Sequence, residues 1–305
     1  MMESQIHEIA DLIHQADAVL VGAGSGLSSA AGYNHYHHDE MFQENFGDFE
    51  DAYGIQNLFQ GFYYLYSKPE QQWGFYARYI DFMEKAPAGQ PYLDLKEILN
   101  GKDYFILTTN CDVQLPKTFP EDKIFQFQGD FRYFQCSQPC HDKLYENRDM
   151  ISAMLRHTVD LTVPSDLIPR CPLCGWKMVP WVQDNTFLQG EKWKADYQRY
   201  EDFVQKYCDK KLLLLELGVG DMTPSVIKLP FWDMTAKFPN AFLSLRFFLL
   251  SRHYLTPPNL LSFLLIKNLS FQISLNFTRK RFLFHWCVFY KCTLDLFIYF
   301  IYSIF

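Results

Sequence analysis

Residues 17–32, "DAVLVGAGSGLSSAAG", place a four-residue apolar run before a glycine-rich turn and a series of small residues. This order predicts a strand, a loop and a helix, which is the opening unit of a dinucleotide-binding fold. Gly22, Gly24 and Gly26 would let backbone N–H groups approach a phosphate, and the N-terminus of the helix would add a favourable dipole. The spacing is not the standard G-x-G-x-x-G, so an ordinary tight turn is the alternative interpretation.

The pattern of a strand followed by a polar loop recurs in residues 103–115, 123–130 and 210–220. The last stretch, "KKLLLLELGVG", is the strongest, because a continuous apolar run is expected of a central strand that is buried on both faces. It ends in a second glycine loop, formed by Gly218, Val219 and Gly220. We therefore predict an α/β fold with a Rossmann-type parallel sheet, whose carboxyl edge forms a ligand crevice.

Helices should cover this sheet. Residues 39–85 are rich in aromatic side chains and lack a strand signal, so we expect helices and a loop there. Residues 196–207 place Tyr and Phe side chains on one helical face, which is typical of core packing. A last strand should begin near Ala241, but an unusual C-terminal tail interrupts it and is expected to remove it.

The tail, residues 246–305, differs from the rest of the chain in composition and charge. It contains seven Lys/Arg and one acid and therefore carries +6, which leaves −13 on residues 1–245 of a chain with net charge −7. This balance does not favour a nucleic-acid-binding surface. The tail has no Ala, Gly, Glu or Met, which favours translation through an intron or past a frameshift.

Two other interpretations of the hydrophobic tail remain: a packed segment, or a membrane anchor at residues 282–305. Lys291 and Asp295 lie near the middle of that stretch, and each would cost about 2.5–3.5 kcal/mol in a bilayer. The N-terminus is amphipathic and shows no signal peptide, so we expect a cytoplasmic or organelle-matrix protein with reduced thiols.

Four cysteines form two closely spaced pairs, Cys136/Cys140 and Cys171/Cys174. Two such turns can place four thiolates tetrahedrally around Zn²⁺, and a site with four thiolates is structural because no position is left for water. Four free thiols are the alternative. The remaining cysteines are interpreted as ordinary thiols. The histidine cluster in "YNHYHHDE" (His35, His37 and His38) is interpreted as a polar loop, with metal binding as the alternative.

Taken together, the motifs resemble those of the sirtuins, and especially of the macrodomain-linked branch of that family. The resemblance covers about residues 1–245 and rests on "GAGSGLSSAAG", "PYLDL", "DYFILTTNCDVQ", "FQGDFRYFQCSQPC", "LIPRCPLCG", "ELGVG" and "PFWDMT". It implies a Rossmann-type NAD-binding domain in residues 1–130 and 191–245, with a zinc-binding module in residues 131–190. The tail, residues 246–305, stands outside it.

The resemblance also implies which residues meet NAD. The loop residues Gly22, Ala23, Gly24 and Ser25 would line its pyrophosphate and nicotinamide ribose. Asn110 and Asp112 would lie beside the nicotinamide and its ribose. Gly218, Val219 and Gly220 would face the phosphate–ribose part of the cofactor.

Gln128 decides which reaction this arrangement can run. Deacylating sirtuins carry a histidine there, which removes a proton from a ribose hydroxyl, whereas a glutamine amide cannot act as a base. They also carry a Pro-Asp-Phe-Arg stretch that this chain lacks after its first glycine loop. The expected activity is therefore ADP-ribosyl transfer, with Asn110, Asp112 and Gln128 as the catalytic candidates.

The branch implies mono-ADP-ribosylation of a lipoyl-carrier protein related to the glycine-cleavage H protein, with a macrodomain hydrolase as a partner that removes the mark. An NAD-dependent lysine deacylase is the alternative enzyme. The second alternative is an inactive remnant, because loss of the last strand near Leu243 would remove contacts to the adenine side of NAD.

Overall fold

The computed structural model describes residues 2–246. The hydrophobic tail that follows Arg246 lies outside the described residues, and so do its interpretations as a translation artefact or a membrane anchor. Within residues 2–246, no helix is long and apolar enough to cross a membrane.

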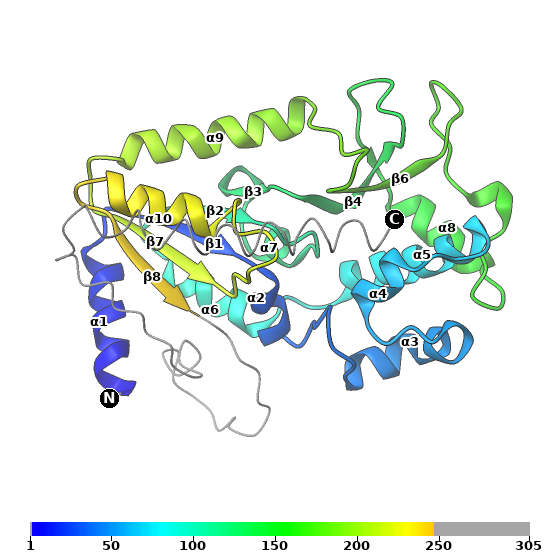
Figure 1. Ribbon diagram of the computed structural model, residues 1–305, viewed down its shortest axis with the longest axis horizontal. Helices are drawn as coiled ribbons and strands as arrows, with labels where there is room; N and C mark the ends of the chain where they lie inside the picture. Colours follow the sequence, from blue (N-terminus) through cyan, green and yellow to red (C-terminus); the bar gives the residue numbers. More distant parts are fainter. Residues whose placement is uncertain (1, 247–305) are drawn as a thin grey trace, which may run out of the picture. The chain divides into compact units, whose positions relative to one another are not determined.

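A five-stranded parallel sheet, in the order β3-β2-β1-β7-β8, carries the carboxyl edge predicted from the sequence (Figure 1). The central strand β1 has the bounds Ala18–Ala23 and pairs with β2 on one side and β7 on the other. Every residue of β1 and β7 is buried, which explains their apolar sequences, with Glu216 of β7 as the one charged residue among them. The other strands are β2 (Asp103–Thr108), β3 (Ile124–Gln126), β7 (Leu212–Leu217) and β8 (Phe242–Arg246).

Strand β8 corrects the expectation that the tail removes the last strand. Its residues pair with β7 in parallel register, from Leu213 opposite Phe242 to Leu217 opposite Arg246. The structural argument for an inactive remnant is therefore wrong as far as this strand is concerned. The residues through Arg246 thus complete the parallel sheet beside β7.

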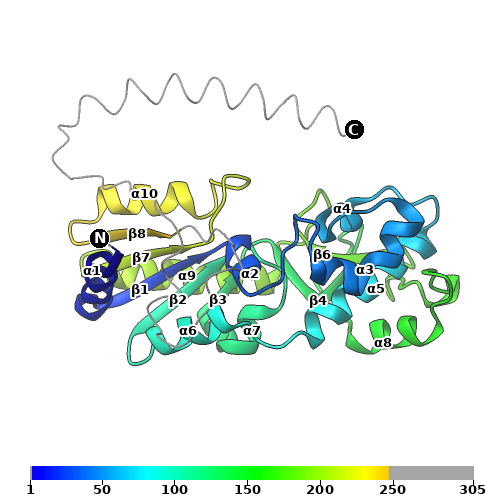
Figure 2. The ribbon, with the colours of Figure 1, turned by 90° about the horizontal axis from the view of Figure 1, so that it is seen from below.

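Helices cover both faces of the sheet, as Figure 2 shows from below. One hydrophobic cluster joins α1, α6 and α7 to one face, and another joins α9 and α10 to the opposite face. This doubly covered parallel sheet confirms the predicted α/β class. The helices are α1 (Met2–Gln15), α6 (Gln90–Ile98), α7 (Gln114–Thr118), α9 (Glu191–Tyr207) and α10 (Lys228–Lys237), and a 3₁₀ turn, η1 (Glu121–Lys123), precedes β3.

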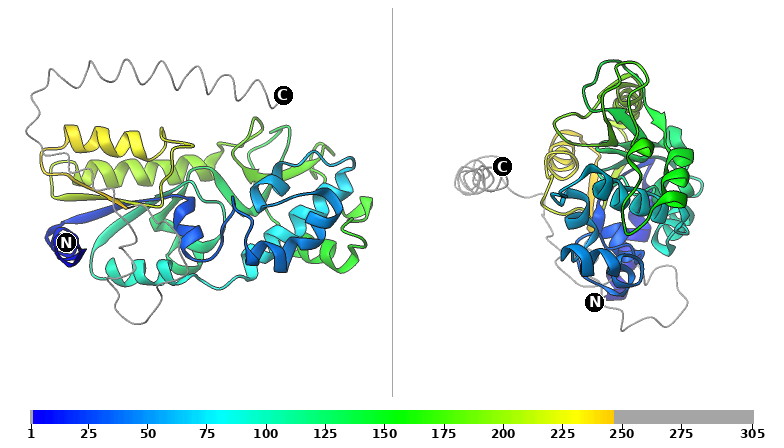
Figure 3. Two further views of the ribbon diagram at one scale, coloured as in Figure 1. Left: turned by 60° about the horizontal axis from the view of Figure 1, so that its bottom comes forward. Right: turned by 90° about the vertical axis from the view of Figure 1, so that its right-hand side faces the viewer.

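A second core surrounds a small antiparallel sheet of order β5-β4-β6. Its helices include the aromatic-rich segment that was expected to be helical, and Figure 3 shows these helices and the small sheet at the same end of the described chain. Phe62 and Tyr79 from this segment pack against Phe131 of β4, with ring centroids 5.5 and 5.0 Å apart. The elements are α3 (Glu40–Tyr53), α4 (Leu58–Tyr63), α5 (Pro69–Lys85), β4 (Gly129–Cys136), β5 (Tyr145–Glu146), α8 (Arg148–His157), η2 (Ser165–Leu167) and β6 (Met178–Val182).

The predicted domain boundaries stay a prediction. The hydrophobic contacts nevertheless show that α3, α4 and α5 share a core with the small sheet, although they precede β2 in the sequence. The chain therefore leaves the parallel sheet after β1, contributes three helices to the second core, and returns to the sheet at β2.

Candidate active site

Two glycine loops meet at the carboxyl edge of the parallel sheet. The N–H of Gly24, just after β1, donates to the carbonyl of Leu217 at 2.9 Å, and the N–H of Gly26 donates to the carbonyl of Gly218 at 3.0 Å. A Cβ at Gly24 would lie 2.6 Å from the oxygen of Gly218, and Gly218 has a φ of +63°. The loops therefore need glycine for their close approach as well as for their turns.

Three backbone donors of these loops remain available to a ligand. Among the hydrogen bonds that the structure records in residues 2–246, none uses the N–H of Ser25, Val219 or Gly220. Ser25 is the first residue of α2 (Ser25–Ala30), where a helix leaves its N–H groups unpaired. A Cβ at Gly220 would meet nothing within 4 Å. Free N–H groups at Ser25, Val219 and Gly220 suit the phosphates of a dinucleotide. Gly22 and Ala23 instead lie inside β1, and the N–H groups of Gly24 and Gly26 are used between the two loops, so the expectation that these glycines offer their N–H groups to a phosphate is wrong.

Asn110 and Asp112 follow β2 and converge on Ser28 of α2. The amide nitrogen Nδ2 of Asn110 donates to the carbonyl of Gly24 and to Oγ of Ser28, at 3.0 Å in each case. The hydroxyl of Ser28 donates in turn to Oδ2 of Asp112. The structure thus joins the two residues predicted beside the nicotinamide to the first glycine loop.

His35 also reaches Asp112 and was not assigned to the site from the sequence. Its Nε2 lies 3.3 Å from Oδ2 of Asp112, and its Nδ1 lies 2.9 Å from the hydroxyl of Tyr79. The hydroxyl of Tyr92 lies 3.0 Å from Oγ of Ser28. These contacts join residues 44 to 77 positions apart in sequence, so no local motif could have indicated them.

The histidine cluster does not gather as one group. His38 is exposed and its Nε2 lies 2.9 Å from a carboxylate oxygen of Glu50, whereas His35 is buried against Asp112. In the part of the chain that the structure describes, the four paired cysteines are the one group of His, Cys, Asp or Glu arranged as metal ligands. The described residues therefore do not bring His35, His37 and His38 together as a set of ligands, and His35 is buried rather than part of an exposed polar loop.

Asp112 is buried but remains an acid of low pKa. Burial alone would raise its pKa, but the hydrogen bond and the charge of His35, together with the bonds from Ser28 and the N–H of Gln114, lower it overall. Burial raises the pKa of the neighbouring Cys111 thiol well above its usual value. The site therefore holds one carboxylate at neutral pH, while the adjacent thiol stays protonated.

Gln128 lies between β3 and β4, where its backbone is held on two sides. Its carbonyl accepts from the N–H of Gln183 at 2.9 Å and from the Cys111 thiol at 3.3 Å. The side chain is half-buried, and no hydrogen bond to another described residue is recorded for its amide. The backbone thus connects Gln128 to the loop of Asp112 and leaves its amide available to a ligand.

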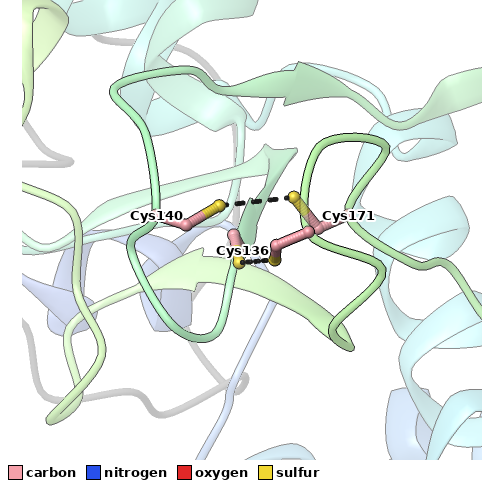
Figure 4. Close-up of side chains that lie close together, drawn as sticks. Cys136, Cys140 and Cys171 are labelled. Carbon is pink, nitrogen blue, oxygen red and sulfur yellow. Dashed lines mark hydrogen bonds between the residues drawn. The ribbon is translucent and has the colours of Figure 1, made fainter.

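The four paired cysteines converge beside the small sheet, as Figure 4 shows for the labelled Cys136, Cys140 and Cys171. The Sγ atoms of Cys136 and Cys174 are 3.6 Å apart, those of Cys140 and Cys171 are 3.7 Å apart, and all four lie within 4.8 Å of one another. Zn–S bonds of about 2.3 Å in a tetrahedron require sulfur atoms about 3.8 Å apart. The four residues predicted as ligands therefore fit one zinc ion.

No family model matches the chain. A search of characterised proteins finds a "Protein ADP-ribosyltransferase" of Staphylococcus aureus, 36% identical over 240 residues, which are 75% of this chain and 73% of the relative. The chain belongs to the protein ADP-ribosyltransferases of the sirtuin family. This membership confirms the resemblance seen in the sequence and makes the chain an NAD-dependent enzyme of that class.

A second relative and a solved structure are also similar to this chain. A Fusarium oxysporum f. sp. cubense protein named "Probable bifunctional ADP-ribose hydrolase/ADP-ribosyltransferase" is 31% identical over 241 residues, which are 74% of this chain and 39% of that protein. A solved structure from a study of sirtuin substrate affinity matches with a TM-score of 0.51 at 16% identity, covering 77% of this chain and 85% of the other. The structural match shows a shared sirtuin fold.

Proposed function

We propose that this enzyme transfers a single ADP-ribosyl group from NAD to an acceptor protein and does not deacylate lysine. Two residues carry the proposal. Asp112 is a buried carboxylate of low pKa, and an amide, Gln128, stands at the position where a deacylase needs a base. Such a site can stabilise positive charge, but Gln128 cannot remove a proton from a ribose hydroxyl.

NAD would occupy the carboxyl edge of the parallel sheet. The free N–H groups of Ser25, Val219 and Gly220 would bind its phosphates, and the side chain of Asn110 would hold the nicotinamide carboxamide. When bound, NAD supplies the ADP-ribosyl group and loses nicotinamide. The described residues provide the donors and the charge that such a step requires.

Asp112 would stabilise the positive charge that develops on the ribose as the bond to nicotinamide weakens. A carboxylate in a dry site interacts with such a charge more strongly than one in water, because fewer water dipoles screen it. Asp112 is 3% exposed, and its hydrogen bonds to Ser28 and His35 hold it in place before NAD binds. The preorganised charge favours bond cleavage without a general base.

Gln128 would orient the acceptor or a ribose hydroxyl by hydrogen bonds. Its backbone carbonyl is held by Gln183 and Cys111, which places the residue next to the loop of Asp112. The thiol of Cys111 does not replace the missing base, because its pKa is raised and it already donates to a carbonyl. The lysine deacylase is therefore the weaker of the two candidate functions.

We further propose that the acceptor is a lipoyl-carrier protein related to the glycine-cleavage H protein, and that a macrodomain hydrolase removes the mark. The acceptor is inferred from the branch that the sequence resembles. The Fusarium relative supports the second part, because its name joins an ADP-ribose hydrolase to an ADP-ribosyltransferase in one chain. This enzyme and a separate hydrolase would together provide the same two opposing activities.

Zinc would be held by Cys136, Cys140, Cys171 and Cys174 and would serve the fold. Four thiolates complete the coordination of Zn²⁺, so the ion has no open position for a substrate. Cys136 and Cys171 are also part of the second hydrophobic core, which links metal binding to the packing of that region.

Mass spectrometry can test the proposed reaction directly. The full chain is incubated with NAD and either an acetyl-lysine peptide or a lipoylated carrier protein. We expect the carrier to gain the mass of one ADP-ribosyl group, and the peptide to keep its acetyl group. Turnover of the peptide without a mass gain on the carrier would favour the deacylase, and no release of nicotinamide in either mixture would favour the inactive remnant.

A further inference from the structure

The loop after α2 fixes the position of the His35 ring. The carbonyl of His35 accepts from the N–H of Phe59 at 2.8 Å. The side chain of Asn34 accepts from the N–H groups of Tyr36 and His37 at 3.0 and 3.2 Å, which holds the loop in a turn. His35 is 9% exposed, so the turn directs its ring inward rather than into solvent.

Both nitrogen atoms of the ring are engaged by protein groups. Burial raises the pKa of Tyr79 well above its usual value, so Tyr79 keeps its proton and can donate to Nδ1 of His35 at 2.9 Å. The proton of a neutral ring then lies on Nε2 and points to the carboxylate of Asp112 at 3.3 Å. The hydrogen bonds define a chain from Tyr79 through His35 to Asp112.

We propose that His35 is a positioning residue that keeps Asp112 oriented and charged, and that Tyr79 holds the His35 ring for this task. The inference rests on the proposed function only where it concerns the rate of transfer. His35 acts through Asp112: neither of its nitrogens is free to take a proton from a substrate. His35 lies after the first glycine loop, in the segment where deacylating sirtuins carry a Pro-Asp-Phe-Arg stretch that this chain lacks.

Tyr79 extends this arrangement into the second core. Its hydroxyl meets His35, while its ring packs against Phe131 of β4 with centroids 5.0 Å apart. Tyr79 is 4% exposed and belongs to α5, whereas Asp112 follows β2 of the parallel sheet. The orientation of the carboxylate therefore depends on contacts from both hydrophobic cores.

Other titratable groups also face Asp112 and bear on its ionisation. Lys117 of α7 interacts with it by charge, and Cys111 precedes it in the loop. Four tyrosines surround it: Tyr33 and Tyr36 from the loop after α2, Tyr79 from α5 and Tyr92 from α6. The tyrosines and the thiol are uncharged at neutral pH, which leaves His35 and Lys117 as the groups that can favour the carboxylate.

The test follows the carboxyl group itself. The full chain is labelled with ¹³C at aspartate carboxyl carbons and titrated by NMR, and the Asp112 signal is identified by its loss in Asp112→Asn. We expect the pKa of Asp112 to rise in His35→Ala, because burial persists while the hydrogen bond from the ring is lost. His35→Gln keeps an N–H donor and should recover part of the change, and Tyr79→Phe should give a smaller rise.

The kinetic counterpart is the pH profile of ADP-ribosyl transfer. His35→Ala should lower kcat roughly tenfold to a hundredfold with little change in the KM for NAD, since a hydrogen bond to a charged group is lost. Its acidic limb should move to higher pH, because the raised pKa lets less acid conditions protonate Asp112. His37→Ala is the matched control, since His37 is exposed in the same loop, and it should match wild type.

The outcomes separate the inference from the proposed reaction. An Asp112 pKa that is the same in wild type, His35→Ala and Tyr79→Phe overturns the positioning role, whatever the transfer assay shows. Absence of transfer by wild type, combined with the expected rise of the pKa, would remove the proposed reaction and leave the positioning role standing. NMR spectra that retain the dispersion of wild type establish that each variant is folded.

Discussion

The cysteine cluster and the Asp112 network are built from contacts of very different range. Each cysteine pair is contained in a turn of four or five residues, and the two turns lie about thirty residues apart. Asp112 instead depends on Ser28 and His35, which precede it by 84 and 77 positions. A metal site made of short local turns can be recognised in a sequence, whereas a network of distant side chains needs the fold.

The largest effect is expected for Cys171→Ser, which removes a proposed zinc ligand that is also buried in the second core. Structural zinc contributes on the order of 10 kcal/mol to folding, so we expect loss of the metal and unfolding of the small sheet. Elemental analysis and thermal denaturation measure the two effects. Cys208→Ser is the control, because Cys208 lies outside the cluster, and zinc-free wild type of unchanged stability would contradict the prediction.

Asp112→Asn should have the opposite profile, with a large loss of activity and a retained fold. We expect the activation free energy of transfer to rise by about 2–4 kcal/mol, because an amide cannot stabilise the positive charge on the ribose. Zinc content should stay at the wild-type level. The exposed Asp149 on α8 offers the matched control, Asp149→Asn, and equal transfer rates in both variants would exclude a catalytic role for Asp112.

A pH effect should arise at Glu216, next to the second glycine loop. Its side chain is buried, one carboxylate oxygen lacks a hydrogen-bond partner, and burial raises its pKa from 4.5 to about 7 against the attraction of Lys228. The folded chain thus keeps a proton that the unfolded chain releases. The resulting stability is complete below about pH 4.5 and is lost as the pH rises to about 7.

Chemical denaturation of wild type and Glu216→Gln measures this contribution. The variant cannot ionise, so its free energy of unfolding should increase relative to wild type between pH 4.5 and 7. Glu201→Gln, at an exposed position of α9, should follow wild type throughout. Parallel curves for wild type and Glu216→Gln would show that the folded chain does not perturb this carboxyl group.

The smallest effect is expected for Gln128→Ala. An orienting hydrogen bond contributes about 0.5–1.5 kcal/mol, so transfer should fall no more than about tenfold and the zinc content should not change. Gln128→His tests the other direction and is expected to leave the enzyme a transferase, since acceptor contacts also decide the reaction. Efficient deacylation of an acetyl-lysine peptide by Gln128→His would contradict that expectation.

Much of the fold could be predicted because its signals are continuous in sequence. The apolar run Leu212–Leu215 and the two glycine loops predicted buried strands that end at one edge, and the structure pairs the loops directly. The role of His35 could not be predicted, because an exposed polar loop and a buried hydrogen-bond donor share the sequence "YNHYHHDE". The strand β8 was underestimated, since composition changes abruptly beside it while its backbone pairing continues to Arg246.

The central place of β1 also sets an order of events during synthesis. β1 is made early, but its partner β7 begins at Leu212, about 190 residues later, which takes roughly ten to forty seconds on a ribosome. The two cysteine turns emerge before β7 and close a much shorter segment of chain. The four cysteines can therefore come together while one edge of β1 still lacks its partner strand, so the small sheet can form before the parallel sheet is complete.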